Sequence, residues 1–126
     1  MAVTYSTAAK TARMQAVIDQ IDAGAGAGTL EIGTTGMASV LAILTLADPS
    51  GTAASGVLTF DFDPDISDSS ANATGTAAEA RIKDSNGTVI ISGLTVGTSG
   101  TDIVLDSTSI TAGQTVTLTT GTITHA

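Results

Sequence analysis

The chain has 126 residues, with twelve acidic against four basic side chains, a net charge of −8, and no cysteine. This length suits one domain. The acidity argues against nucleic acid or an anionic membrane surface as a partner, because no basic stripe can form. The lack of cysteine excludes disulfides, thiolate metal sites and cysteine catalysis. With two Phe, one Tyr and no Trp, the core must be mainly aliphatic, which favours further burial between copies or against a partner.

The first predicted element is an α-helix from Thr7 to about Ile21. Ser6 or Thr7 is suited to cap its start, and Gly24 to end it. The residues before it are expected to form an extended arm which, with the helix, reaches between subunits. Apolar side chains recur at helical spacing and predict the face that packs against a sheet or a neighbouring subunit: Met14, Val17, Ile18 and Ile21.

A Gly/Ala segment, residues 24–28, follows the helix. Glycine at alternate positions disfavours a helix and predicts a hinge. The Lys-Ser/Thr pair of a P-loop is missing, so this segment is not expected to bind phosphate. We therefore divide the chain into an N-terminal arm and helix (residues 1–23), a hinge (24–28) and a β-sandwich domain (29–126).

The remainder of the chain predicts short strands separated by turn residues. They cover residues 29–32, 38–46, 57–62, 77–83, 88–91, 101–105 and 115–119, the last with a pattern that continues to Ile123. The clearest signal is the hairpin of 77–91, where small and apolar residues alternate with charged ones and Asn86-Gly87 supplies a positive-φ turn. This spacing predicts a mainly β fold, an antiparallel β-sandwich or jelly-roll-like barrel with one N-terminal α-helix.

The segment from Ala38 to Leu46 carries apolar residues on both faces of its predicted strand. Such a strand lies in the centre of a sandwich or at an interface. We therefore expect it to serve packing in the core or at an interface. Together with the apolar residues of the helix, four of its side chains make up the predicted interface set: Val40, Ala42, Leu44 and Leu46.

Four carboxylates follow the predicted strand of residues 57–62 or overlap its end: Asp61, Asp63, Asp65 and Asp68. Hard oxygen ligands of this kind are what Ca²⁺ prefers, but the glycine and the bidentate glutamate of an EF-hand loop are missing. The alternative is a solvated strand end, and no cofactor is expected. The single histidine, His125, lies beside the C-terminus, where a catalytic triad is not expected. The chain is therefore predicted not to be an enzyme.

From about Thr11 to its end, the order of sequence features resembles a family of small tailed-bacteriophage virion proteins. Each landmark is short and of low complexity, and the order in which they occur is what is distinctive. The landmarks are Ile18-Asp19-Gln20-Ile21-Asp22-Ala23-Gly24, Thr29-Leu30-Glu31-Ile32, Leu41-Ala42-Ile43-Leu44-Thr45-Leu46, Ala54-Ser55-Gly56-Val57-Leu58-Thr59, residues 71–75, Ala80-Arg81-Ile82-Lys83-Asp84-Ser85-Asn86-Gly87, residues 96–105, and Ile110-Thr111-Ala112-Gly113-Gln114-Thr115-Val116.

The resemblance implies a capsid decoration (cement) protein that binds the major capsid protein on the outer surface of the virion and clamps neighbouring capsomers. It also implies a homo-oligomer, often a trimer at local threefold points, made in the host cytoplasm. No nucleic-acid or membrane partner is expected, and no apolar run approaches the ~20 residues that span a bilayer. The alternatives are a phage tail or fibre component, or a Ca²⁺-dependent surface or carbohydrate-binding β-module.

Overall fold

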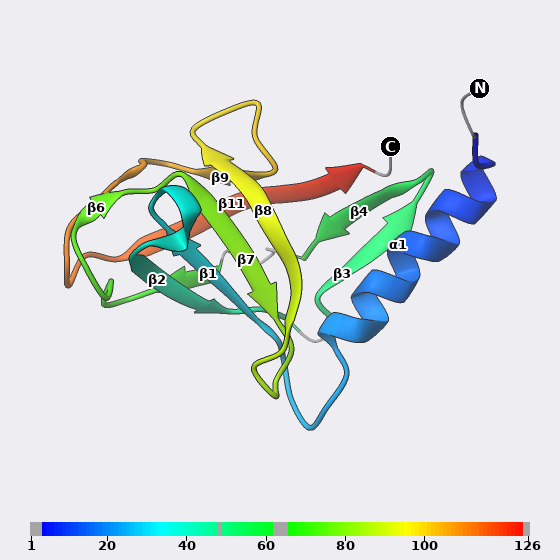
Figure 1. The fold of residues 1–126 in the computed structure, drawn as a ribbon, viewed down its shortest axis with the longest axis horizontal. Coiled ribbons are helices and arrows are strands. Elements are labelled where there is room, and N and C mark those ends of the chain that lie inside the picture. Colours follow the sequence, from blue (N-terminus) through cyan, green and yellow to red (C-terminus); the bar gives the residue numbers. More distant parts are fainter. Residues whose placement is uncertain (1–3, 48, 62–65, 125–126) are drawn as a thin grey trace.

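The computed structural model describes residues 4–47, 49–61 and 66–124. These residues form a curled, mixed β-sheet shaped as a half-barrel, with one α-helix packed beside it (Figure 1). The predicted fold class, mainly β with one N-terminal helix, is confirmed. The elements are α1 (Thr7–Ile21), β1 (Thr29–Gly33), the short 3-10 helix η1 (Thr35–Met37), β2 (Val40–Thr45), β3 (Gly51–Ala54), β4 (Val57–Phe60), β5 (Ile66–Asp68), β6 (Gly75–Thr76), β7 (Glu79–Lys83), β8 (Val89–Gly97), β9 (Ile103–Leu105), β10 (Ser109–Ile110) and β11 (Val116–Thr124).

The main sheet has the strand order β2-β1-β7-β8-β9-β11-β4-β3, and β5 pairs with β11 outside this path. The pairs are antiparallel except for a short parallel step between β8 and β9. The loop of this step is held by Asp102: its carboxylate accepts bonds from the backbone N–H and the hydroxyl of Thr95, each at 3.0 Å. The two strands at the ends of this order, β2 and β3, are the edges of the sheet.

The β2 end of the sheet is covered by the segment around β5. The backbone N–H of Ile43 in β2 donates to the Asp68 carboxylate at 3.0 Å. Nearby, the N–H of Asn72 donates to the carbonyl oxygen of Leu41 at 2.7 Å. These bonds satisfy edge groups of β2 that would otherwise be open to another strand.

The predicted hairpin of residues 77–91 is present as β7, a turn and β8. Asp84 begins the turn, and its carboxylate accepts bonds from the N–H groups of Asn86 and Thr88 at 2.9 Å. Gly87 has the predicted positive φ, +86°, but Asn86 does not, so this part of the prediction was wrong. The structure extends the second strand to Gly97, beyond the predicted end at Ile91.

A second hairpin, β3–β4, was not fully predicted, because the sequence placed a break at residues 48–51 and no strand before Val57. Its two turn residues, Ser55 and Gly56, have φ +51° and +76°, which is typical of a two-residue hairpin turn. The N–H of Gly56 donates to the Thr11 hydroxyl of α1 at 2.9 Å. The turn is therefore fixed against the helix.

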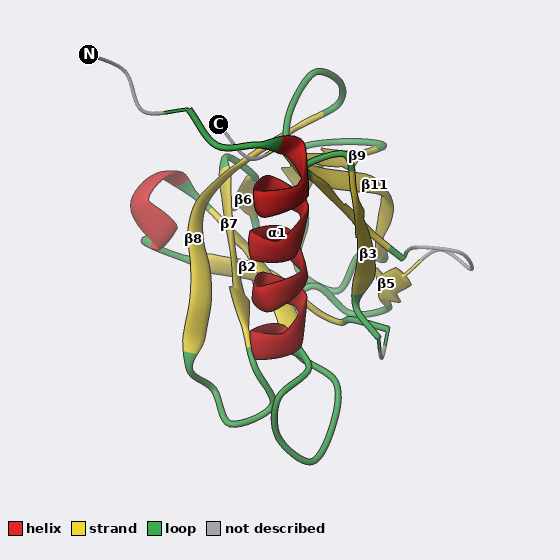
Figure 2. Ribbon diagram, turned by 90° about the vertical axis from the view of Figure 1, so that its right-hand side faces the viewer, coloured by secondary structure: helices red, strands yellow, loops and turns green. Residues whose placement is uncertain are grey.

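Helix α1 begins at a side-chain cap, because the Ser6 hydroxyl accepts a bond from the N–H of Ala9 at 3.1 Å. Its buried face, Met14, Ile18 and Ile21, packs mainly on β3 and β4. Figure 2 shows the helix in front of the curled sheet. At its end, the Asp22 carboxylate accepts from the N–H of Ser50. The helix is thus joined to the sheet at both ends and along its apolar face.

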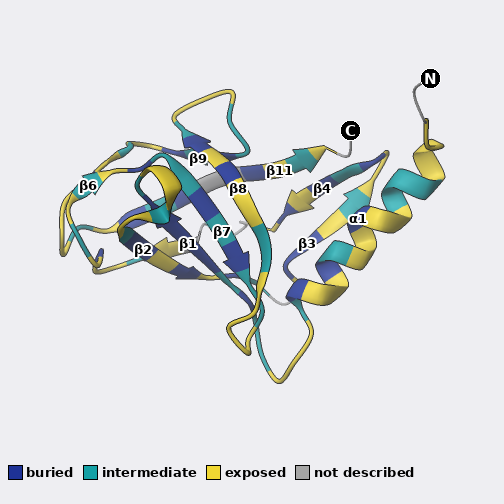
Figure 3. Cartoon of the chain, in the orientation of Figure 1, coloured by how far each residue is buried: buried dark blue, intermediate teal, exposed yellow. Residues whose placement is uncertain are grey.

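One aliphatic core runs through the inside of the half-barrel and under the helix (Figure 3). It excludes water most completely at the centres of β1, β2, β7 and β9. The fully buried large side chains are Ile18, Ile21, Leu30, Ile32, Leu41, Leu44, Leu58, Ile82, Ile103, Leu105, Ile110 and Leu118. Among the described residues, no helix combines the length and apolar character that a membrane span needs.

Candidate functional site

A charged cluster lies on the solvent side of the sheet, across β1 and β7. The strands pair in a register that places Glu31 opposite Arg81. Glu31 Oε1 lies 2.6 Å from Arg81 Nε, and its Oε2 lies 3.3 Å from Lys83 Nζ. The Glu31 carboxylate therefore forms ion pairs with two of the four basic residues of the chain.

The environment of Glu31 is unusual for a carboxylate on the solvent side of a sheet, because the residue is only 8% exposed. Burial by itself would raise its pKa, but hydrogen bonds and charge attraction from Arg81 and Lys83 outweigh this and hold the pKa below the ordinary value of 4.5. The group is a charged structural element at neutral pH, and it is not poised as a general acid.

The sequence reasoning missed this cluster. Alternation did place Glu79, Arg81 and Lys83 on one wet face of the hairpin strand. Glu31 was embedded in a short apolar strand, and nothing in the pattern showed that this strand pairs with residues 79–83. The missing information was a strand pairing between positions 50 residues apart.

The predicted acidic cluster is only partly within the described residues, because Asp63 and Asp65 lie outside them. Asp68 is used in the fold: Oδ2 accepts from the N–H of Ile43 and Oδ1 from the N–H of Ser70, each at 3.0 Å. Asp61 donates its backbone N–H to the carbonyl oxygen of Ser50 at 2.9 Å. Within residues 4–47, 49–61 and 66–124, no three His, Cys, Asp or Glu side chains lie together as metal ligands would. The calcium site stays a prediction.

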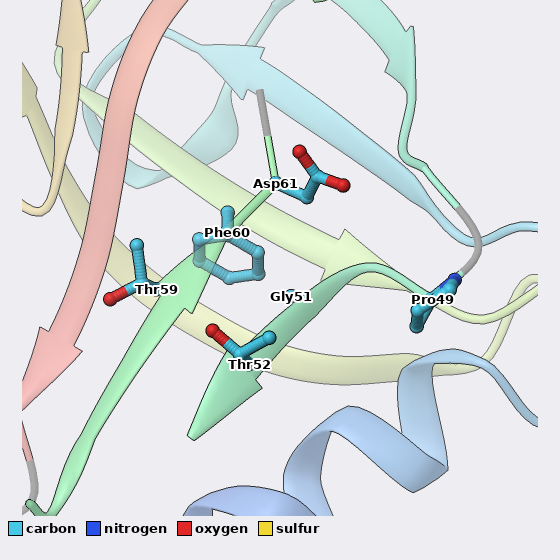
Figure 4. A pocket seen from close by; sticks show the side chains of 6 residues that line it. All are labelled: Pro49, Gly51, Thr52, Thr59, Phe60 and Asp61. Atoms are coloured by element: carbon cyan, nitrogen blue, oxygen red, sulfur yellow. The ribbon is translucent and has the colours of Figure 1, made fainter. Parts of the chain in front are cut away.

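An open hollow of about 270 Å³ lies beside the β3–β4 hairpin (Figure 4). Thr52 and Thr59, which are cross-strand partners, contribute two exposed hydroxyl side chains. The Asp61 carboxylate is the ionisable group among the described lining residues, so the hollow offers hydrogen-bond partners without a nucleophile–base pair. The lining residues are Pro49, Gly51, Thr52, Thr59, Phe60 and Asp61.

The residues predicted for an interface mostly lie in the core of the chain itself. Six of the eight are buried: Met14, Ile18, Ile21, Ala42, Leu44 and Leu46. Val17 is partly buried against the same core, and Val40 has intermediate exposure. Since their side chains are occupied within one subunit, a partner would have to bind elsewhere on this structure. The single histidine, His125, lies outside the described residues.

Comparison with protein-family models, with curated proteins and with solved structures found no match to this chain. The function must therefore be argued from the residues and the geometry.

Proposed function

We propose that this chain is a structural protein of a bacteriophage virion: a capsid decoration protein that binds the major capsid protein on the outside of the head and stabilises neighbouring capsomers. It acts as a homo-oligomer, for which the resemblance favours a trimer at local threefold points. Its partners are shell proteins, and it carries out no chemical step. The ordered landmarks along the sequence and the distribution of charge support this proposal.

The observation that carries the proposal is how the four basic side chains are used. Arg81 and Lys83 lie against Glu31. The Arg13 guanidinium lies 4.0 Å from the centre of the Tyr5 ring, and the Lys10 side chain lies beside Gly56. Three of the four basic groups, those of Arg13, Arg81 and Lys83, are thus engaged by neighbours within the subunit, and the chain carries twelve acidic residues against four basic ones.

A subunit with this charge is favoured on one side of a DNA-filled shell. Packed DNA makes the interior strongly negative, and a chain of net charge −8 would be repelled from it. On the outer surface the same charge keeps unbound copies soluble. The charge thus fits a protein that is added to the outside of a completed shell.

The proposal is tested by mixing the purified chain with DNA-filled phage heads that lack decoration. We expect saturable co-sedimentation and a rise in the temperature at which the capsids lose their DNA. Capsids that neither retain the chain nor gain heat resistance would reject the proposal. Labelling of tails in place of heads would favour the tail or fibre alternative.

A further inference from the structure

The turn that joins β7 to β8 contains a chemically labile pair of residues. Asn86 is followed directly by Gly87, and it is one of the two asparagines of the chain. Asparagine is among the thermolabile residues of proteins. It reacts most readily before glycine, because a residue without Cβ leaves its backbone nitrogen open to approach and its φ and ψ free to change.

The backbone of this turn shows how the pair is held. Asp84 and Thr88 close a loop of three residues: the Asp84 N–H donates to the Thr88 carbonyl oxygen at 3.0 Å, and the Gly87 N–H donates to the Asp84 carbonyl oxygen at 3.1 Å. Gly87 alone of the three has a positive φ, which is typical of a type I turn followed by a left-handed residue. The loop residues Ser85, Asn86 and Gly87 are all exposed, so water reaches the Asn86 side chain.

We propose that Asn86 is a site of spontaneous deamidation. The backbone nitrogen of Gly87 bonds to Cγ of Asn86 and the Cγ–Nδ2 bond breaks, so that the amide leaves as ammonia with the proton of the attacking nitrogen. Water then adds to the cyclic imide and opens it on either side of the imide nitrogen, which leaves aspartate or isoaspartate at position 86. No enzyme, cofactor or partner takes part, and the inference does not depend on the proposed function.

The two asparagines of the chain differ in how far the fold permits this reaction. At Asn86 the attacking Gly87 nitrogen must first leave its bond to Asp84, and an exposed turn opens locally at less cost than the sheet unfolds. Asn72 is followed by Ala73, which carries a Cβ and packs against the core. The N–H of Asn72 is also bonded to the Leu41 carbonyl oxygen at 2.7 Å. The reaction is therefore expected at Asn86 and not at Asn72.

The new carboxylate would stand beside the C-terminal end of helix α1, next to which the turn lies (Figure 1). The Ser85 hydroxyl donates to the Ala23 carbonyl oxygen at 3.3 Å, and Asn86 Nδ2 lies 3.4 Å from the position that a Cβ of Gly24 would take. The last turn of α1 holds no basic residue, and the carbonyl groups make this end of a helix partially negative. Exchange of the amide for a carboxylate therefore places like charge there and weakens the contact between turn and helix.

The test is incubation of the folded chain in warm, mildly alkaline buffer, with samples taken at intervals for trypsin digestion and mass spectrometry. Cleavage after the basic residues separates the two asparagines, because residues 14–81 contain Asn72 and residues 84–126 contain Asn86. We expect the mass gain of an amide-to-acid exchange in the second fragment, localised to position 86 by tandem fragmentation, and none in the first. The gain should be faster in urea, where the bond that holds the Gly87 nitrogen is lost.

Variants make the test specific. Asn86→Gln keeps the amide and the net charge but lengthens the ring that the attack would form, so the mass gain in residues 84–126 should disappear. Asn72→Gln is the matched control and should leave that gain unchanged. Asn86→Asp reproduces one product and should lower the melting temperature by about 2–5 °C, and an unchanged melting temperature would contradict the effect on α1. A folded chain without a gain at position 86, an equal gain at Asn72, or a gain in Asn86→Gln as fast as in the wild type would overturn the inference.

Discussion

The two faces of strands β1, β2 and β7 are built from alternate residues of the same short segments, yet they do different work. The inner face is aliphatic and closed: Leu30, Ile32 and Ile82 have no exposed surface. The solvent-facing side combines the Glu31 cluster with the exposed side chain of Ile43, and Val89 of the neighbouring strand β8 is exposed beside it. A one-residue shift in register would exchange the two faces. The comparison teaches that the first face stabilises the subunit by burial, whereas the second is organised by charge pairing around Glu31.

The largest loss of stability is expected when a side chain of the inner face is truncated. Replacing Ile82 by Ala removes a fully buried side chain from the centre of the half-barrel, which should lower the free energy of unfolding by about 3 kcal/mol. Urea denaturation followed by circular dichroism measures this. A loss below about 1 kcal/mol would mean that the core around β7 is loosely packed.

The next largest effect on the free energy of unfolding is expected at Gly28, where the chain that leaves helix α1 lies close to Lys83 and Ile21. A Cβ atom at Gly28 would lie 2.6 Å from the Lys83 carbonyl oxygen and 2.8 Å from Ile21 Cγ2, so Gly28→Ala should cost about 1–3 kcal/mol. At Gly26 nothing lies within 4 Å of the same atom, and Gly26→Ala should be neutral or slightly stabilising. Equal stabilities of the two variants would show that residues 24–28 do not hold the helix close to the sheet.

The charged cluster should make stability depend on pH. The pKa of Glu31 is lower in the folded chain than its ordinary value of 4.5. The ionised Glu31 carboxylate therefore contributes to the free energy of unfolding above pH 4.5, and this contribution is lost as the pH falls through the lower pKa of the folded chain. At pH 7, Glu31→Gln should cost about 1–2 kcal/mol because Arg81 and Lys83 lose their counter-charge.

The check is to compare unfolding of the wild type and the Glu31→Gln variant from pH 7 to pH 3. The difference between them should persist to about pH 4.5 and shrink below it. A difference that grows as the pH falls would contradict the assigned direction of the pKa.

The smallest effect on the free energy of unfolding is expected at the two exposed aliphatic residues of the sheet, Ile43 and Val89. Ile43→Thr and Val89→Thr should each change the free energy of unfolding by no more than about 0.5 kcal/mol, because these side chains are already 39% and 45% exposed. Thermal unfolding of the wild type and of each variant at the same protein concentration measures it. A loss as large as that of Ile82→Ala would mean that these residues belong to the core of the subunit.

Local patterns predicted most of the elements because they reflect local physics. The Ser6 cap, the apolar side of α1 and the Asn86-Gly87 turn depend on residues near in sequence, and all three are present. The pattern also showed that residues 40–46 would be buried, but it left open whether by the chain or by a partner. The structure assigns most of this strand to the core of the subunit.

The features that could not be predicted from the sequence all depend on which strands pair. The Glu31–Arg81 contact joins two segments far apart in the chain, and the parallel step between β8 and β9 has no local signal. The β3 strand was missed because its Gly-Thr-Ala-Ala composition is poor in strand-forming residues. It forms because β4 and α1 pack against it. The Glu31 cluster could therefore be recognised only once the register of β1 and β7 was known.

The central claim is that this chain decorates the outside of a phage head, and cryo-electron microscopy of capsids incubated with it tests that claim most directly. The account predicts new density on the outer surface, at symmetry-related positions between capsomers, into which the half-barrel and helix α1 fit. An outer surface identical to that of untreated capsids, with the chain left free in solution, would contradict it.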